Sequence, residues 1–385
     1  MNPSVLLKGY DLKHLTIASL GGHSALDVCH GAKKYGFQTM VVARKGREKT
    51  YDKYFRYRDA KKGRFDRPRG CIDGVLVVDE FKDVLKKNVQ EKIRKENALF
   101  IHSRYFWVYF PDYEEVEKNF RVPMFGSRSL LKLEERDQPF NQYHLLAKAG
   151  IRTPKIFGKP EDIDRPVIVK AREAARGYER GFFVVSTPEE YEEKGSKLEH
   201  EGKIADDWRS AVIEEFIVGA PVNFNFFYSP LSKELELIGT DTRRQTNLDG
   251  VLRMPAWDQM DMRDHLDLKM IETGHMAVTV KESLLERAFN LGEKFVTACK
   301  KLPKLIDPDQ KGIIGPFALQ GAVVAEEGKE DIVIFDVSFR IPGSPAVRAT
   351  PYSGYLYGES VSMGERIGME IRRAVEEKRL EEVLT

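Results

Sequence analysis

Cysteine is scarce in this chain of 385 residues, which contains three, at positions 29, 71 and 299. Their odd number and wide spacing argue against a disulfide framework or a cysteine-bound zinc site, and are typical of reduced thiols inside a cell. No apolar stretch approaches the roughly 18 residues that a membrane span requires, and charged residues interrupt the N-terminus where a signal peptide would have its apolar core. We therefore expect a soluble, cytoplasmic protein.

An excess of charge of one sign is also missing. The 62 lysine and arginine residues nearly cancel the 60 aspartate and glutamate residues, so the field of the whole molecule does not favour nucleic acid or a membrane surface. One local exception is the segment 44–69, which holds 12 basic and four acidic residues with aromatic residues between them. Such a segment could follow a single-stranded nucleic acid, but without a recognised motif a solvated loop or a subunit contact is the favoured interpretation.

The first third of the sequence alternates short apolar strands with amphipathic helices. Strands are predicted at 15–20, 37–42, 75–78 and 98–101. This order predicts a parallel sheet with right-handed crossovers, hence a Rossmann-like domain whose ligands bind at the carboxyl ends of the strands. His23 and the turn at 102–105 fall at such ends.

The remaining sequence predicts a helical linker and two further lobes. A chain of this length exceeds what one hydrophobic core usually supports, about 250–300 residues. We divide it into an N-terminal Rossmann-like domain (1–127), a helical linker (128–160), a small lobe (161–220) and a large lobe with a metal site (221–385). The predicted fold class is therefore α/β combined with α+β.

Two strand ends in the small lobe carry residues suited to a nucleotide. Lys170 ends the apolar strand 167–170 and could neutralise phosphate groups. Glu214 and Glu215 end another apolar strand, where a carboxylate could accept the ribose hydroxyls while exposed backbone groups read the adenine edge. Each feature alone is an ordinary surface feature, so the interpretation rests on their combination.

Two later strands carry possible metal ligands. Gln320 and Asp336 alternate with apolar neighbours, so each can point to one face of a sheet. An amide oxygen and a carboxylate suit Mg²⁺, which binds oxygen and usually keeps substrate phosphates among its ligands. Arg340 lies four residues after Asp336 and could stabilise charge on a transferred phosphoryl group. A buried Asp–Arg pair with a hydrogen-bonded glutamine is the structural alternative.

Several stretches in one order resemble the archaeal PurP family of formate-dependent purine-synthesis ligases. They lie at 16–24, 122–126, 227–230, 281–285, 315–320 and 362–367. The resemblance implies an ATP-grasp fold and an ATP-dependent carbon–nitrogen ligase that makes formyl phosphate from formate. The formyl group would then pass to the amino group of the ribonucleotide AICAR. It also implies Mg²⁺ or Mn²⁺, no membrane partner, and a homo-oligomer built from trimers.

The resemblance implies roles for individual residues. His23 and Ser103 would hold the phosphate or ribose of AICAR, and His275 would lie near it. Gln320 and Asp336 would bind the metal ion, and Arg340 would act in catalysis. The ATP-binding residues would be Lys170, Glu214, Glu215, Phe216, Val218 and Gln245.

The chain departs from the family at several of these positions. Gln245 stands where the family has glutamate, and His275 where it has asparagine. The loop 171–180 has one interior glycine, and 341–346 introduces two prolines and an alanine. Two alternatives therefore stay open: a paralogue that uses another carboxylate or another amino-ribonucleotide, and a non-catalytic nucleotide- or RNA-binding protein.

Overall fold

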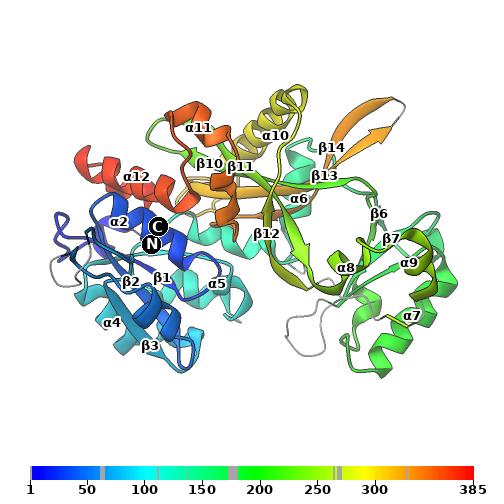
Figure 1. The fold of residues 1–385 in the computed structure, drawn as a ribbon, viewed down its shortest axis with the longest axis horizontal. Helices are drawn as coiled ribbons and strands as arrows, with labels where there is room; N and C mark the ends of the chain where they lie inside the picture. Colours follow the sequence, from blue (N-terminus) through cyan, green and yellow to red (C-terminus); the bar gives the residue numbers. More distant parts are fainter. Residues whose placement is uncertain are drawn as a thin grey trace.

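A computed structural model describes residues 2–60, 66–110, 112–136, 138–171, 181–262, 265–266, 271–326 and 328–385. The loop 172–180 and positions 61–65 of the basic segment lie outside the described residues. Within the described ranges the named strands form three sheets, and two outer lobes flank a central sheet (Figure 1). No helix in those ranges is long and apolar enough to cross a membrane.

The first sheet is parallel and has the order β3-β2-β1-β4-β5. Its strands are β1 (Thr16–Leu20), β2 (Gln38–Arg44), β3 (Gly74–Val78), β4 (Ala98–Ile101) and β5 (Met124–Phe125). Every residue of β1 is buried, which is typical of a strand covered on both faces. The loops after β1 and β4 meet at one edge, as the alternation of strands and helices predicts.

The C-terminal segment returns to this first sheet. Helix α12 (Met363–Glu376) crosses α2 (Ala25–Lys34) where two glycines allow backbone contact: a Cβ on Gly31 would lie 2.1 Å from the carbonyl of Gly364. Leu384 forms a bridge to Phe125 of β5. The end of the chain thus packs against its beginning. The domain boundaries at residues 127, 160 and 220 stay a prediction from the sequence.

The second sheet is antiparallel, with the order β6-β9-β7-β8. Its strands are β6 (Ile156–Phe157), β7 (Val167–Lys170), β8 (Phe182–Val185) and β9 (Val212–Glu215). Helix α7 (Pro188–His200) packs on it through Tyr191, whose ring lies 4.9 Å from that of the fully buried Trp208 in the 3₁₀ segment Trp208–Ser210. The predicted linker helix consists of a 3₁₀ segment, Arg128–Glu134, and a separate helix α6 (Gln142–Lys148).

The third sheet is antiparallel, with the order β12-β11-β10-β13-β14. Its strands are β10 (Ala220–Ser229), β11 (Glu234–Gln245), β12 (Glu272–Ala277), β13 (Gly315–Glu326) and β14 (Lys329–Ser338). Helix α10 (Glu282–Lys300) packs on one face, where Phe295 stacks on Phe317 at 5.1 Å. The strand period of two then turns Asn223, Asn225 and Gln320 to the opposite face.

Two short helices after β11 are absent from the prediction. They are α8 (Thr246–Val251) and α9 (Ala256–Met262). The edge strand β12 is also absent from it, although β12 contributes to the site described next.

Candidate functional site

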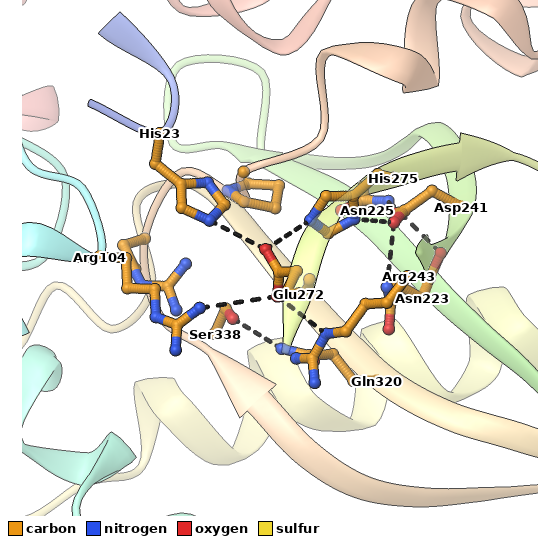
Figure 2. A pocket seen from close by; sticks show the side chains of 14 residues that line it. His23, Arg104, Asn223, Asn225, Asp241, Arg243, Glu272, His275, Gln320 and Ser338 are labelled. Atoms are coloured by element: carbon orange, nitrogen blue, oxygen red, sulfur yellow. Dashed lines mark hydrogen bonds and ion pairs between the residues drawn. The ribbon is translucent and has the colours of Figure 1, made fainter. Parts of the chain in front are cut away.

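The polar face of the third sheet meets the loops that follow β1 and β4, and a pocket lies between them. His23 comes from the first loop, Arg104 from the second, and Glu272 and His275 from β12 (Figure 2). The segment after β14 closes one side, where Ser24 Oγ donates a hydrogen bond to the carbonyl of Pro342 at 3.1 Å. Gly343 lies directly against the imidazole of His23, because a Cβ there would come within 1.5 Å of the ring.

Glu272 is the centre of this pocket. Its Oε1 lies 3.0 Å from Nε2 of His23 and 3.0 Å from Nε2 of His275. Burial would raise the pKa of Glu272, but the hydrogen bonds from both histidines and the charge of Arg243 outweigh it, so the pKa falls far below its usual range. The carboxylate is therefore ionised at any physiological pH.

The two histidines differ in their charge. Burial lowers the pKa of His23, and its hydrogen bond to Glu272 does not compensate, so this imidazole is neutral. Burial also acts on His275, but its hydrogen bonds to Asp241 and Glu272 outweigh it and raise the pKa to about 9. Without a ligand, His275 therefore carries a proton on each ring nitrogen near neutral pH.

Asp241 supports His275 from beneath the pocket. The Nδ1 atom of His275 is hydrogen-bonded to Asp241 Oδ2, which also accepts from Asn223 Nδ2 at 3.0 Å. The other oxygen of Asp241 accepts from Asn225 Nδ2 at 2.6 Å. Asp241 and Asn225 are fully buried, so this network fixes the orientation of the His275 ring.

A second pocket continues from the first along the sheet. Its lining includes Arg104, Arg243 and Gln320, which also line the first pocket, together with Asp336. Gln320 and Asp336 are register partners on β13 and β14. The amide oxygen of Gln320 accepts from Arg243, and its amide nitrogen donates to Ser338 Oγ at 2.8 Å.

Two arginines accompany the predicted metal residues. Arg136 lies 3.4 Å from Asp336 Oδ1. Burial would lower the pKa of Arg136, but Asp336, Tyr143 and Glu214 together outweigh burial and raise it. Arg340 is buried and forms a 3.2 Å ion pair with Glu134. The sequence offered an Asp336–Arg340 pair only as the structural alternative to a phosphoryl-binding arginine.

Lys170 and Glu214 form a buried ion pair beside this second pocket. The ammonium lies 2.7 Å from both carboxylate oxygens, 3.2 Å from the Tyr143 hydroxyl and 3.4 Å from the Phe335 carbonyl. Burial lowers the pKa of Lys170 against the opposing charge of Glu214. Phe335 directly precedes Asp336 in the chain. The contact of Lys170 with the Phe335 carbonyl therefore places the predicted nucleotide-binding pair next to the predicted metal ligand Asp336.

The structure brings some of the predicted residues together and separates others. His23, His275, Gln320, Asp336 and Arg340 line the two adjoining pockets, and Lys170 with Glu214 lies beside them. Five others lie outside the lining of both pockets. Ser103 is buried, Val218 is 80% exposed, and Glu215 pairs with Arg165. Gln245 hydrogen-bonds to Asp249 through its backbone, and Phe216 donates its backbone N–H to the carbonyl of Pro166.

Several lining residues escape the sequence prediction. Asn223 and Asn225 lie on one face of β10, and Asp241 and Arg243 on the same face of β11. On β10 the alternation of these asparagines with the buried Phe224 and Phe226 was a usable signal. Glu272 gave no comparable signal, because β12 has no regular apolar alternation.

Comparisons with known proteins cover nearly the whole chain. Residues 17–157 match a protein family of unknown function (DUF1246), and residues 190–385 match a domain of unknown function (DUF1297). A 5-formaminoimidazole-4-carboxamide-1-(beta)-D-ribofuranosyl 5'-monophosphate synthetase from Methanopyrus kandleri is 38% identical over 99% of this chain and 98% of its own. The protein of that name from Methanothermobacter thermautotrophicus is 39% identical, over 99% and 97%.

Solved structures extend the likeness to the fold. The crystal structure of an IMP biosynthesis protein PurP from Thermococcus kodakaraensis has a TM-score of 0.67 and 26% identity, covering 96% of this chain and 100% of that one. A biotin carboxylase–ATP complex from Campylobacter jejuni has a TM-score of 0.56 at 12% identity, covering 92% and 70%. These likenesses confirm the predicted ATP-grasp fold, with its parallel N-terminal sheet.

Proposed function

This chain belongs to the archaeal PurP family of 5-formaminoimidazole-4-carboxamide ribonucleotide synthetases, and we propose that it formylates AICAR with ATP and formate in purine synthesis. A formate oxygen would attack the γ-phosphorus of ATP, which releases ADP and leaves formyl phosphate. The AICAR amine would then attack the formyl carbon, losing a proton while inorganic phosphate leaves.

One observation supports this proposal most directly. The Lys170–Glu214 pair, Asp336 and Gln320 adjoin one another, and Gln320 also lines the pocket that holds His23. A nucleotide on one side and an amine substrate on the other would therefore meet above Gln320. Such positioning, with water kept from the acyl phosphate, is how an enzyme of this class would accelerate both steps.

The charges of the second pocket suit phosphoryl transfer. Arg104, Arg136, Arg243 and Arg340 all line it. Cationic donors held in a partly closed pocket stabilise negative charge on a transferring phosphoryl group more strongly than water does. In this proposal Arg340 contacts that group, while Glu134 holds the guanidinium in place through its 3.2 Å ion pair.

The donor atoms near the second pocket fit a hard divalent cation. Gln320 and Asp336 offer an amide oxygen and a carboxylate from register partners. Such an ion would neutralise charge on the ATP phosphates. The residues of this chain then have separate tasks: Lys170 faces the phosphate groups, and Glu214 and Tyr143 hold its ammonium in position.

The test is direct. Protein incubated with ATP, Mg²⁺, formate and AICAR should yield the formylated nucleotide, detected by mass, and an equal amount of ADP. We expect Asp336→Asn to abolish ADP formation while the thermal unfolding curve is kept. Asp331→Asn is the matched control, because Asp331 lies on the same strand but pairs with Arg152 and Arg287 at the surface. Full turnover by Asp336→Asn would remove the metal assignment.

His275 supports one alternative, in which the enzyme acts on a different substrate. Where the family has a neutral amide, this chain places an imidazole that is protonated when no ligand is present. A different amino-ribonucleotide, or another carboxylate, would then be the true substrate. ADP release with such a substrate, but not with AICAR and formate, would decide for this alternative.

The oligomeric state, which we propose to be a homo-oligomer built from trimers, can be measured by light scattering.

A further inference from the structure

His23, Glu272 and His275 present three ligand atoms to one point. All of these atoms lie within 4.8 Å of one another, and the group is the single one of its kind in the described part of the chain. Two imidazole nitrogens and one carboxylate oxygen are a common ligand set of Zn²⁺ and of related transition metals. We propose that these three residues bind a divalent transition-metal ion, at a site separate from the magnesium of the nucleotide.

The distances fit such an ion with little movement. A tetrahedral zinc ion with ligands at about 2.0–2.1 Å keeps those ligands roughly 3.3 Å apart. Glu272 Oε1 already lies 3.0 Å from Nε2 of each histidine. Each histidine nitrogen would therefore need to move only a few tenths of an ångström away from Glu272 Oε1, and the two histidine nitrogens lie within 4.8 Å of each other. All three side chains are partly buried, with exposures of 20%, 18% and 10%.

The surroundings of His275 support ligation through Nε2. Its Nδ1 atom faces Asp241, so this nitrogen keeps its proton and the other is directed at Glu272. A carboxylate behind a metal-binding histidine fixes the ring and increases the basicity of the ligating nitrogen. Asp241 is itself held by two asparagine amides, which prevents it from turning toward the metal position.

Glu272 is held so that one oxygen is available. Its Oε2 lies 3.4 Å from Arg243 and 3.6 Å from Arg104, on the side away from the histidines. This leaves Oε1 as a single ligand atom, as Figure 2 shows. The arginines also oppose the added positive charge, so an anionic oxygen as a further ligand of the ion would strengthen binding.

The ligand types separate this site from the magnesium residues. Nitrogen ligands favour zinc, iron, copper or nickel over Mg²⁺, whereas the amide and carboxylate oxygens of Gln320 and Asp336 favour magnesium. The proposal does not depend on the identity of the formylated substrate.

The competitor for this position is a proton on His275. The His275 ring lies between Asp241 and Glu272, with Nε2 directed at a carboxylate oxygen, so metal binding must displace the hydrogen that Nε2 donates to Glu272. Metal binding should therefore release protons, which calorimetry in two buffers of different ionisation enthalpy detects. The same experiment decides between a metal site and a purely ionic cluster.

The test uses the purified full-length chain after treatment with a chelator. We expect one Co²⁺ per chain, with the visible absorption of a low-coordinate cobalt ion, and displacement by one equivalent of Zn²⁺. His275→Asn and His23→Gln should each weaken binding at least 100-fold, and Asp241→Asn, which acts through His275, by about 10–100-fold. His14→Asn is the control, because His14 lies on the surface beside Asp11.

Two results would overturn the proposal: no stoichiometric Co²⁺ in the unaltered chain, or equal affinity after His275→Asn with the fold retained. The Asp336→Asn variant keeps this test apart from that of the proposed function. It should lose ADP formation and keep the Co²⁺ spectrum.

Discussion

The ion pair between Lys170 and Glu214 offers the sharpest test of how the nucleotide side of the site is held. The two side chains are 6% and 2% exposed, and the ammonium contacts both carboxylate oxygens at 2.7 Å. Glu214→Gln removes the opposing charge and keeps the shape. The acceptors around the ammonium would then all be neutral: the Tyr143 hydroxyl, the Phe335 carbonyl and the amide oxygen of the new glutamine.

The cost follows from these contacts. Breaking a buried ion pair from one side usually costs about 3–5 kcal/mol. The upper limit is set by deprotonating the lysine at pH 7, which costs about 4.6 kcal/mol from an ordinary pKa of about 10.4. Burial already lowers the pKa of Lys170. The loss of unfolding free energy in the Glu214→Gln variant should therefore lie at or just below the lower end of about 3–5 kcal/mol.

Urea unfolding followed by circular dichroism measures the effect, with Glu215→Gln as the matched control. Glu215 is the next residue, but its side chain is 26% exposed and pairs with Arg165 at the surface, so its loss should cost less than about 1 kcal/mol. The double variant Lys170→Met, Glu214→Gln removes both charges. Its loss of unfolding free energy should be smaller than the sum of the two single losses by at least about 2 kcal/mol. Equal effects at 214 and 215, or strict additivity in the double variant, would refute this reasoning.

Two further predictions concern the loops of the first sheet. Gly343→Ala should displace the His23 ring and raise the KM for the amine substrate more than that for ATP, whereas Gly158→Ala, with nothing within 4 Å, should change neither. His102 is buried, neither ring nitrogen has a hydrogen-bond partner among the described residues, and burial with the charge of Arg340 lowers its pKa to about 3. Its neutral form therefore contributes stability that is present above pH 6.5 and lost as the pH falls toward 3, up to about 5 kcal/mol. In thermal melts between these pH values His102→Leu should show a weaker pH dependence than the unaltered chain; an unchanged dependence would contradict the assignment.

Much of the fold could be predicted because the deciding pattern is local. Apolar runs separated by helices predict a parallel sheet, and β1, β2, β3 and β4 lie within two residues of their predicted ends. The return of the C-terminus to β5 could not be predicted this way. It is made by the bridge between Phe125 and Leu384, and the contact of Gly31 with Gly364 accompanies it; both join residues separated by most of the sequence.

The site was predicted less completely, for a related reason. Residues at the ends of apolar strands, such as Lys170 and Asp336, can be identified from their own neighbours. Their partners cannot: Lys170 pairs with Glu214 across two strands, and Arg340 with Glu134 from a distant 3₁₀ segment. Glu272 lies on a half-exposed edge strand with an irregular register, where hydrophobic periodicity gives no signal.

The arrangement of Gln320 decides which substitutions can separate the two sites. Its amide oxygen accepts from Arg243, and Arg243 faces Glu272 of the histidine cluster, while its backbone pairs with Asp336 on the next strand. Replacing Gln320 would therefore free Arg243 and disturb Glu272 as well as the magnesium residues. Asp336 and His275 lie at opposite ends of this row of contacts. For that reason the substitutions at these two ends, rather than one at the shared glutamine, distinguish loss of the nucleotide site from loss of the pocket beside His23.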